Sequence, residues 1–427
     1  MLKALYSSLG ALLLSLFLCQ TPLSAQKQGW HYVPMPELAY STDLGWTLGT
    51  YCDFFDYGDG SDYPNFRHHI DVTAAWASKG SHFIHLLGES KTLIPGFRVS
   101  GSMTYRKATA SSFYGFNGIR SPYHRDWDQD LTTGLAYYNI DRELLRAHFN
   151  IQGSILRDQP LRWTGGLLFR KINMAPHSLE DYKSGSVASL YADYLNAGLI
   201  RDGEAGGGLS LTAQLGLVWD SRDVEWVPSR GMYAEAYLNA CGDLAENGSN
   251  YAQAVLHFRH FIPAIPGRLT VAYHIGFQQQ ITGKMPWYHL NEISTLYYAH
   301  EEFEGIGSRD TMRGVLYNRF AAAGYLWGNF ELRTRVFSVT LFGQDFDGIL
   351  SPFLDLTGIT KYFRSEEQAG FAGLLYQDDR SKRLFASAGC GAKLHMNTNF
   401  ILSLDVGRAF DPEVACTTIS MGTIYMF

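Results

Sequence analysis

The sequence predicts an all-β fold, a transmembrane antiparallel barrel of about sixteen strands, and three observations support this prediction. Aromatic residues make up 14% of the chain, there are 43 glycines, and charged residues are only 18%. After residue 25 no apolar run is long enough for a transmembrane helix. Many segments instead alternate apolar and polar side chains with a period of two, which is typical of strands between lipid and a lumen.

Residues 1–25 are predicted to be a cleaved secretory signal peptide, which leaves residues 26–427 for the barrel domain. Lys3 gives the positive start, and a short apolar run ends before the small residue Ala25, which suits cleavage. Four cysteines remain, far apart and without metal-ligand spacing, so free thiols are expected and no metal or cofactor is predicted. The net charge of −6 and the lack of a basic stripe argue against a nucleic-acid partner.

The strand prediction depends on the period of two. Between residues 209 and 219, for example, leucines alternate with serine, threonine and glutamine. The polar faces mix Gly, Ser, Tyr and isolated charges, as expected for a lumen, and lipid requires closure because an open edge would leave amides unpaired. The expected strands are 36–41, 44–56, 66–78, 81–93, 97–109, 140–156, 162–174, 208–221, 231–243, 250–263, 268–282, 322–338, 347–359, 384–396, 399–409 and 416–427.

The connectors between these segments sort into two classes. Short ones are expected to be periplasmic turns, and long ones external loops, with both termini on the periplasmic side. A helix is expected within the loop segment 179–196. The short connectors are 94–96, 157–160, 263–267 and 396–399, and the long ones are 110–139, 175–207, 283–321 and 360–383.

The last predicted strand carries a candidate targeting signal. Ile419, Met421, Thr423, Tyr425 and Phe427 share one face if the strand runs to residue 427. Tyr425 and Phe427 resemble the terminal aromatic address that the barrel-assembly machinery reads during biogenesis. An aromatic girdle at the membrane interface would need the same residues.

A second motif joins two strands near the middle of the chain. Asp220, Arg222, Asp223, Pro228 and Gly231 form a D-x-R-D pattern followed by P-x-x-G. This pattern resembles the periplasmic turn of the bacterial surface antigen family, the BamA/TamA-like assembly and translocation barrels. A well-capped turn alone is the alternative, because Asp accepts backbone amides, Pro fixes φ and Gly allows positive φ.

A third motif lies in the sixth long connector and strengthens the resemblance. In that family the sixth external loop folds into the lumen, and the arginine of its V-R-G-F or V-R-G-Y tip meets an aspartate on the next strand but one. Here Arg313 and Gly314 stand at the tip, and the alternation points Phe353 and Asp355 inward. The resemblance implies that Arg313 pairs with Asp355, pins the loop and narrows the pore, while Gly314 permits close approach to the wall.

The resemblance extends over the mature chain, with two departures. Segments 113–118 and 403–410 are similar to further family segments. Val315 replaces the usual aromatic residue, and Thr357 stands where a second glycine is usual, so the packing of the loop tip is expected to differ.

Three charges are expected on the inner side of one strand, namely Glu331, Arg333 and Arg335. They could line a channel, or they could hydrogen-bond the inserted loop. The sequence leaves both possibilities open.

The resemblance implies a non-enzymatic role: assisting the insertion or translocation of protein or lipid at a seam between the first and last strands, with unidentified protein partners. Only residues 26–35 precede the first expected strand, so the chain is expected to resemble family members without periplasmic POTRA modules. The predicted location is the bacterial outer membrane, in contact with its lipid.

Two alternatives remain. The first is a porin-like passive channel. The second is an outer-membrane lipase or protease, for which the histidine pairs 68–69 and 257–260 would be candidates. Each pair points to opposite faces of a strand, and no G-x-S-x-G motif accompanies either pair.

Overall fold

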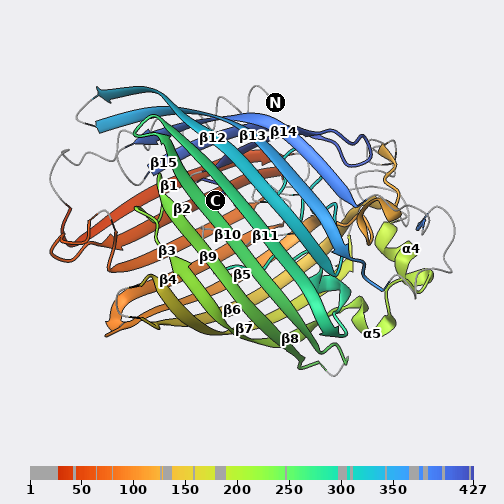
Figure 1. Cartoon of the computed structure of the whole chain (residues 1–427). Coiled ribbons are helices and arrows are strands. Elements are labelled where there is room, and N and C mark those ends of the chain that lie inside the picture. Colours follow the sequence, from red (N-terminus) through yellow and green to blue (C-terminus); the bar gives the residue numbers. More distant parts are fainter. Residues whose placement is uncertain are drawn as a thin grey trace.

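The computed structural model describes residues 27–41, 45–63, 65–78, 80–125, 127, 137–156, 159–177, 189–245, 248–296, 305–307, 311–341, 344–364, 375–377, 383–396, 400–422 and 425–427. Sixteen strands form one antiparallel sheet in which each strand pairs with its neighbours in the sequence. This sheet curls into a barrel (Figure 1).

The strands vary in length around the barrel. They are β1 (Trp30–Ser41), β2 (Gly45–Asp56), β3 (His68–Ala77), β4 (His82–Ile94), β5 (Phe97–Ser112), β6 (Asn139–Ser154), β7 (Leu161–Pro176), β8 (Gly207–Asp220), β9 (Gly231–Asp243), β10 (Tyr251–Ile265), β11 (Leu269–Gly283), β12 (Gly324–Leu341), β13 (Gln344–Lys361), β14 (Leu384–Met396), β15 (Phe400–Ala409) and β16 (Thr417–Gly422).

The structure confirms the predicted sixteen-stranded fold but corrects the bounds of the outermost strands. β1 begins at Trp30 instead of residue 36, and it contains Pro34 and Pro36. Proline cannot donate to a ladder, so it is tolerated in a strand that pairs on one side, as β1 does with β2. β16 ends at Gly422 instead of continuing to residue 427.

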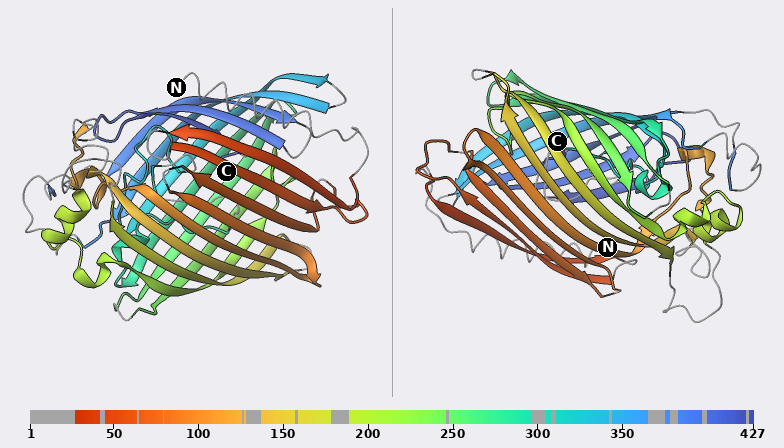
Figure 2. Two further views of the ribbon diagram at one scale, coloured as in Figure 1. Left: turned by 180° about the vertical axis from the view of Figure 1, so that it is seen from behind. Right: turned by 90° about the horizontal axis from the view of Figure 1, so that it is seen from below.

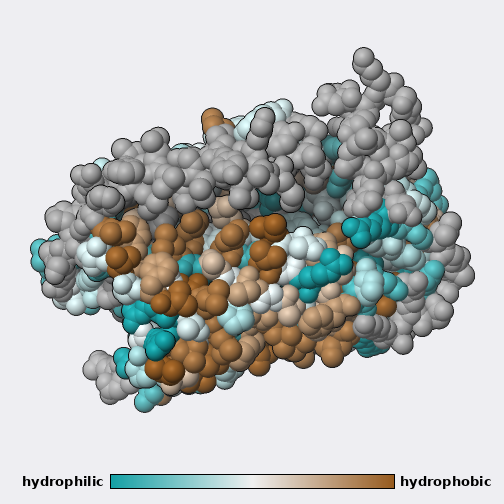
Figure 3. Space-filling model, turned by 90° about the horizontal axis from the view of Figure 1, so that it is seen from above, coloured by the Kyte–Doolittle hydropathy of each residue, from teal (hydrophilic) through white to brown (hydrophobic). Residues whose placement is uncertain are grey.

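The two faces of the sheet differ as the period of two requires. On β8, Gln214 is 6% exposed and its neighbour Leu215 is 69% exposed. We call the face with buried side chains the inner face and the other the outer face. Apolar side chains gather on the outside of the barrel (Figure 3), so hydrocarbon is a suitable environment for this surface.

The connectors also divide as expected. Short turns such as 95–96 and 266–268 join strands at one end of the barrel, the turn end. Long connectors and the helices α4 (Leu190–Asn196) and α5 (Asp202–Ala205) lie at the other, the loop end (Figure 1). α4 confirms part of the expected helix; residues 178–188 lie outside the described part. Among the described residues, no helix is long and apolar enough to cross a membrane.

Buried aromatic side chains join the connectors at the loop end. Phe116 contacts Tyr194 of α4 and Phe363 of the β13–β14 connector, with ring centroids 5.3 and 5.0 Å away. Phe113 packs edge-on against Trp287 of the β11–β12 connector, in the short 3-10 helix η2 (Trp287–His289). The segment 113–118, which the family resemblance singled out, thus lies at the centre of this packing.

The sheet has a seam where its first and last strands meet. β1 lies on the same side of the barrel as the C-terminal strands (Figures 1 and 2). β16 pairs with β15 over only six residues, Thr417 to Gly422. In the described residues, no hydrogen-bonded register joins β1 to β16.

Candidate functional site: a buried ion cluster at the loop tip

Arg313 binds Asp355 through two parallel hydrogen bonds. Its Nε donates to Oδ2 and its Nη2 to Oδ1, both at 2.9 Å, and the Arg313 backbone N–H donates to the same carboxylate at 3.1 Å. Asp355 lies on the inner face of β13 and is fully buried, and the Arg313 side chain is 1% exposed. The planar guanidinium matches a carboxylate in both distance and direction, so this pair fixes the loop tip in one orientation.

Two neighbouring side chains position this pair. The Arg313 guanidinium lies over the ring of Phe353, 3.4 Å from its centroid. The Asn329 amide donates to Asp355 at 3.0 Å and to the backbone oxygen of Thr311 at 2.8 Å. Asn329 therefore binds both the carboxylate and the loop backbone.

The pair belongs to a larger cluster with balanced charge. Arg313 also donates to Glu331 at 2.7 Å and lies 3.6 Å from Asp405. Lys393 of β14 lies 3.1 Å from Asp405, and Arg333 donates to Glu331 at 2.9 Å. Three cations thus face three carboxylates, which lowers the cost of burying each charge. Burial opposes the charged form of Arg313, but Asp355 and Glu331 outweigh it and raise the pKa of the guanidinium.

Gly314 brings the loop backbone against the last two strands. Its φ is +80°, and a Cβ at this position would lie 2.4 Å from the backbone nitrogen of Arg408. The Gly314 carbonyl accepts from Ala409 and Cys416, and its N–H donates to the Thr418 hydroxyl at 2.7 Å. The loop tip is therefore attached to β15, to β16 and to the connector between them.

Val315 and Thr357, the two departures from the motif of the family that the sequence resembles, are both buried. Val315 is 2% exposed and forms an isolated antiparallel bridge with Ala415. Thr357 is buried on the inner face of β13. The loop tip thus packs by backbone pairing at the position where the family motif has an aromatic ring.

The three charges predicted on β12 divide into two groups. Glu331 and Arg333 belong to the buried cluster and hydrogen-bond within it. Arg335 does not join them: its side chain is 40% exposed, lies 3.5 Å from Asp347 and donates to the Gly267 carbonyl at the turn end. A register shift next to Arg335 accompanies this change in position.

The predicted position of the C-terminal aromatic residues is wrong. Ile419 and Met421 lie on the outer face, but Tyr425 is 5% and Phe427 1% exposed. The Arg333 guanidinium lies 3.8 Å from the Tyr425 ring and donates to the Phe427 backbone oxygen at 2.8 Å. These residues pack on the inner face because a cation and apolar rings provide partners there; their role in assembly stays a prediction.

The turn motif is organised as a capped turn. Arg222 grips Asp220 through two hydrogen bonds of 2.8 Å. Asp223 accepts from three backbone N–H groups, those of Val224, Ser229 and Arg230. Pro228 is buried. Gly231 has φ +96°, and a Cβ there would lie 2.2 Å from the Ser221 carbonyl oxygen, so only glycine fits without strain.

The β11–β12 loop has a second anchor, formed by Glu292 and Ser294 with side chains of β6, β7, β10 and β11. Glu292 accepts from Arg142 of β6 at 2.9 Å and from Arg170 of β7. Burial disfavours the Glu292 carboxylate, but Arg170 and Arg142 outweigh it and lower its pKa to about 2. The Ser294 carbonyl accepts from the His257 ring at 2.9 Å, and the Ser294 N–H donates to the Gln278 side-chain oxygen at 2.8 Å.

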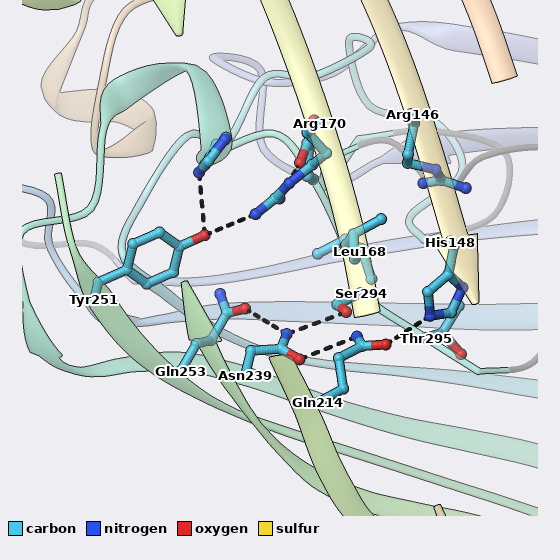
Figure 4. A pocket seen from close by; sticks show the side chains of 13 residues that line it. Arg146, His148, Leu168, Arg170, Gln214, Asn239, Tyr251, Gln253, Ser294 and Thr295 are labelled. Carbon is cyan, nitrogen blue, oxygen red and sulfur yellow. Dashed lines mark hydrogen bonds and ion pairs between the residues drawn. The ribbon is translucent and has the colours of Figure 1, made fainter. Parts of the chain in front are cut away.

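A polar cavity of about 50 Å³ lies beside this anchor. Arg170 and Tyr251 meet at its edge, and a hydrogen-bonded row from His148 through Gln214 and Asn239 lies below them (Figure 4). The row comes from inner-face positions of three strands, which fixes that side of the cavity.

Two candidate histidines of the alternative hydrolase lie apart from one another on β10. His257 is buried and His260 half-buried, on opposite faces as expected. His257 instead meets His274 across the sheet, at 3.0 Å between ring nitrogens. Across the described ranges there is no group of three or more metal-ligating side chains.

The comparisons with known proteins support the fold. No protein-family profile and no curated protein sequence match the chain. Among solved structures, BamA from Haemophilus ducreyi lacking POTRA domains 1-3 matches 92% of this chain and 69% of its own, with 13% identity and a TM-score of 0.51. CdiB from Escherichia coli matches 92% of this chain with 11% identity and a TM-score of 0.53. CdiB from Acinetobacter baumannii matches 95% with 11% identity and a TM-score of 0.50.

The fold is that of the BamA and CdiB barrels. At this level of identity the likeness concerns the fold alone. The chain spans 61% and 64% of the lengths of the two CdiB chains.

Within this BamA-like and CdiB-like barrel, several residues of the site were missed in the sequence, among them Lys393, Asp405 and Arg319. Lys393 and Asp405 stand at inward positions of β14 and β15, and each is the lone aspartate, glutamate, lysine or arginine among the inward positions of its strand. This pattern is the signal that could have found them. Arg319 donates to the carbonyls of Gly118 and Ser121 and is 1% exposed; its place in a connector gave no periodic signal.

Proposed function

We propose that this chain is an integral barrel of the bacterial outer membrane that assists the insertion or translocation of polypeptide or lipid together with partner proteins. The fold likeness to BamA and CdiB supports this proposal, as does the apolar outer face. The turn end would face the periplasm and the loop end the exterior. The barrel-assembly machinery would act on the chain during biogenesis, and no nucleic acid or cofactor is part of the proposal.

The observation that carries the proposal is the double attachment of the loop tip. Arg313 is held by the wall through Asp355 and Glu331, while the adjacent Gly314 is held by Ala409 and Thr418 of the last two strands. Movement of β16 at the seam would therefore disturb the backbone that orients Arg313. We propose that the β11–β12 loop lies in the lumen as a plug and couples its position to the seam.

The same contacts make a passive pore the weaker candidate. The loop meets the inner face at two places, the Arg313 cluster and the Glu292 anchor. A segment tied at both places would narrow the lumen. We therefore expect small or rare conductance from the purified protein in planar bilayers.

The proposal includes no catalytic step. His257, the most buried of the candidate histidines on β10, pairs with the backbone carbonyl of Ser294 and with His274, and not with a hydroxyl nucleophile. A hydrolase assay on the purified protein with ester and peptide substrates would test this part directly.

Isolation of the native complex tests the function. The chain would be extracted from outer membranes in mild detergent, and the proteins that co-purify would be identified by mass spectrometry. A stable protein partner together with a closed barrel supports the proposal. Steady open channels from the purified chain, without any partner, would favour the porin instead.

A further inference from the structure

The connector between β8 and β9 reaches beyond its own hairpin. We call residues 221–230 the strap. Glu225 in the strap binds Lys91 of β4, and Arg98 of β5 donates to the same carboxylate at 3.0 Å. The three side chains are 17 to 24% exposed, so water only partly screens the pairs. Arg98 is held in turn by Glu89.

The strap makes an apolar contact next to these ion pairs. The Trp226 ring packs edge-on against Phe55 and His69, with centroids 6.0 and 5.3 Å away, and lies 6.4 Å from Phe66. Phe55 lies near the end of β2 and His69 near the start of β3, so this contact reaches the turn end of the β2–β3 pair. The Lys91 ammonium lies 4.4 Å from the Phe66 ring, which links the apolar and ionic contacts.

The base of the strap holds its tip in place. Asp220 grips Arg222, and the Arg222 guanidinium also donates to the Glu225 carbonyl at 2.7 Å. Asp223 accepts from Ser229 and Arg230 across the turn. The motif therefore presets the direction in which Glu225 and Trp226 project.

Sheet order places these partners far apart along the wall. β5 is three strands from β8, and β2 is six. Neighbouring strands are about 4.8 Å apart, so the wall path is roughly 14 Å to β5 and twice that to β2. Side chains cannot cover this distance along the wall. The strap backbone therefore leaves its own hairpin and extends toward β2 to β5 at the turn end.

We propose that the strap closes the turn-end mouth of the lumen as a gate of its own, latched by the Glu225 ion pairs and by the Trp226 ring. The strap contacts described above are made with β2 to β5 and the β2–β3 connector, and not with Arg313. The proposal therefore rests on other residues than the loop lock and does not depend on the proposed transport function.

Access to the lumen from the turn end tests the gate. Ser100, two residues beyond Arg98 on β5, is 8% exposed on the inner face. In the full chain with all of its native cysteines replaced by alanine, Ser100→Cys would be labelled in nanodiscs with a charged, membrane-impermeant maleimide. Glu225→Gln and the double variant Glu225→Gln/Trp226→Ala would be compared with the parent.

We expect labelling to rise about tenfold or more in the double variant and by a smaller factor in Glu225→Gln, as the open population of the strap grows. Arg230→Gln is the matched control, because it removes an exposed charge from the same turn, and it should leave labelling unchanged. Arg313→Ala should also leave it unchanged, which separates this gate from the loop.

Folding of each variant would be verified by heat-modifiable migration on gels. Labelling that stays at the parental rate in folded Glu225→Gln/Trp226→Ala would overturn the proposal and leave the strap a static brace. If the double variant does not fold, the labelling rate of the isosteric variant Glu225→Gln is the test, and a parental rate in that folded variant would overturn the proposal. A rise in Arg313→Ala equal to that in the strap variants would also overturn it.

Discussion

Arg313 and Asp355 are 42 residues apart in the chain, yet two hydrogen bonds of 2.9 Å join them in a site with almost no solvent access. This pair closes a long connector onto the wall. Ordering each residue of such a connector costs about 1–2 kcal/mol, so a single weak contact would not hold it. A bidentate charged pair inside a charge-balanced cluster is strong enough to offset a substantial part of this ordering cost.

Arg313→Ala should release the loop tip. The substitution leaves Asp355 and Glu331 buried with fewer cations, which costs about 3–5 kcal/mol for a buried pair. We expect faster protease cleavage within 284–323, and higher single-channel conductance once the strap is also opened by Glu225→Gln/Trp226→Ala. Arg335→Gln is the control: its side chain is 40% exposed, so its loss should cost less than about 1 kcal/mol and change neither readout. Unchanged cleavage in Arg313→Ala, together with unchanged conductance when this substitution is added to the strap double variant, would contradict the lock.

Gly314→Ala should destabilise the loop tip more than another glycine at similar φ. Gly198 also has positive φ, +74°, but a Cβ there meets nothing within 4 Å. Each alanine carries the left-handed penalty of about 1–2 kcal/mol, and only at Gly314 does the methyl also collide with the Arg408 backbone. Urea titration of both variants in lipid vesicles measures the difference. Equal unfolding midpoints would show that the backbone of the loop tip is not in close steric contact with β15.

Phe427→Ala should cost more stability than Phe410→Ala. Phe427 is 1% exposed, its ring stacks with Phe261, and the Arg333 guanidinium lies over it. Its truncation leaves a cavity and should lower the free energy of unfolding by about 3–5 kcal/mol. Phe410 is 67% exposed, and its loss should have a much smaller effect on the free energy of unfolding. Similar losses in the two variants would instead favour a girdle position for Phe427 at the lipid interface.

The strands were predictable because each has one apolar and one polar face. On β8 and β13 the alternation alone gives the direction of Gln214, Phe353 and Asp355. The failure occurs where the alternation in the sequence continues past the end of the strand: Ile419, Met421, Tyr425 and Phe427 follow one pattern, yet the last two pack inside. The period of two does not indicate that β16 ends at Gly422.

The site was predictable only where a motif marked it. Arg313 and Asp355 followed from the family resemblance, but their partners Lys393 and Asp405 depend on strand register, which sets β14 and β15 side by side. Glu225 and Trp226 lay within a recognised turn motif, but nothing local indicates contacts with β2 to β5. Such contacts depend on how the curled sheet brings distant strands near the strap, and no local pattern in the sequence encodes that arrangement.

The Glu292 anchor should weaken in acid, and the direction follows from its pKa. In the folded state this pKa is about 2, below the ordinary value of 4.5, so ionised Glu292 stabilises the fold above pH 4.5. That contribution, on the order of 3 kcal/mol for a shift of this size, is lost as the pH falls toward 2. Glu292→Gln lacks it at every pH. In urea titrations we expect the free-energy gap between wild type and Glu292→Gln to be largest near pH 6 and to shrink markedly by pH 2.5. A gap that stays constant over this range would mean that Arg142 and Arg170 gain nothing from the ionised carboxylate, and that the Glu292 anchor does not hold the loop by ion pairing.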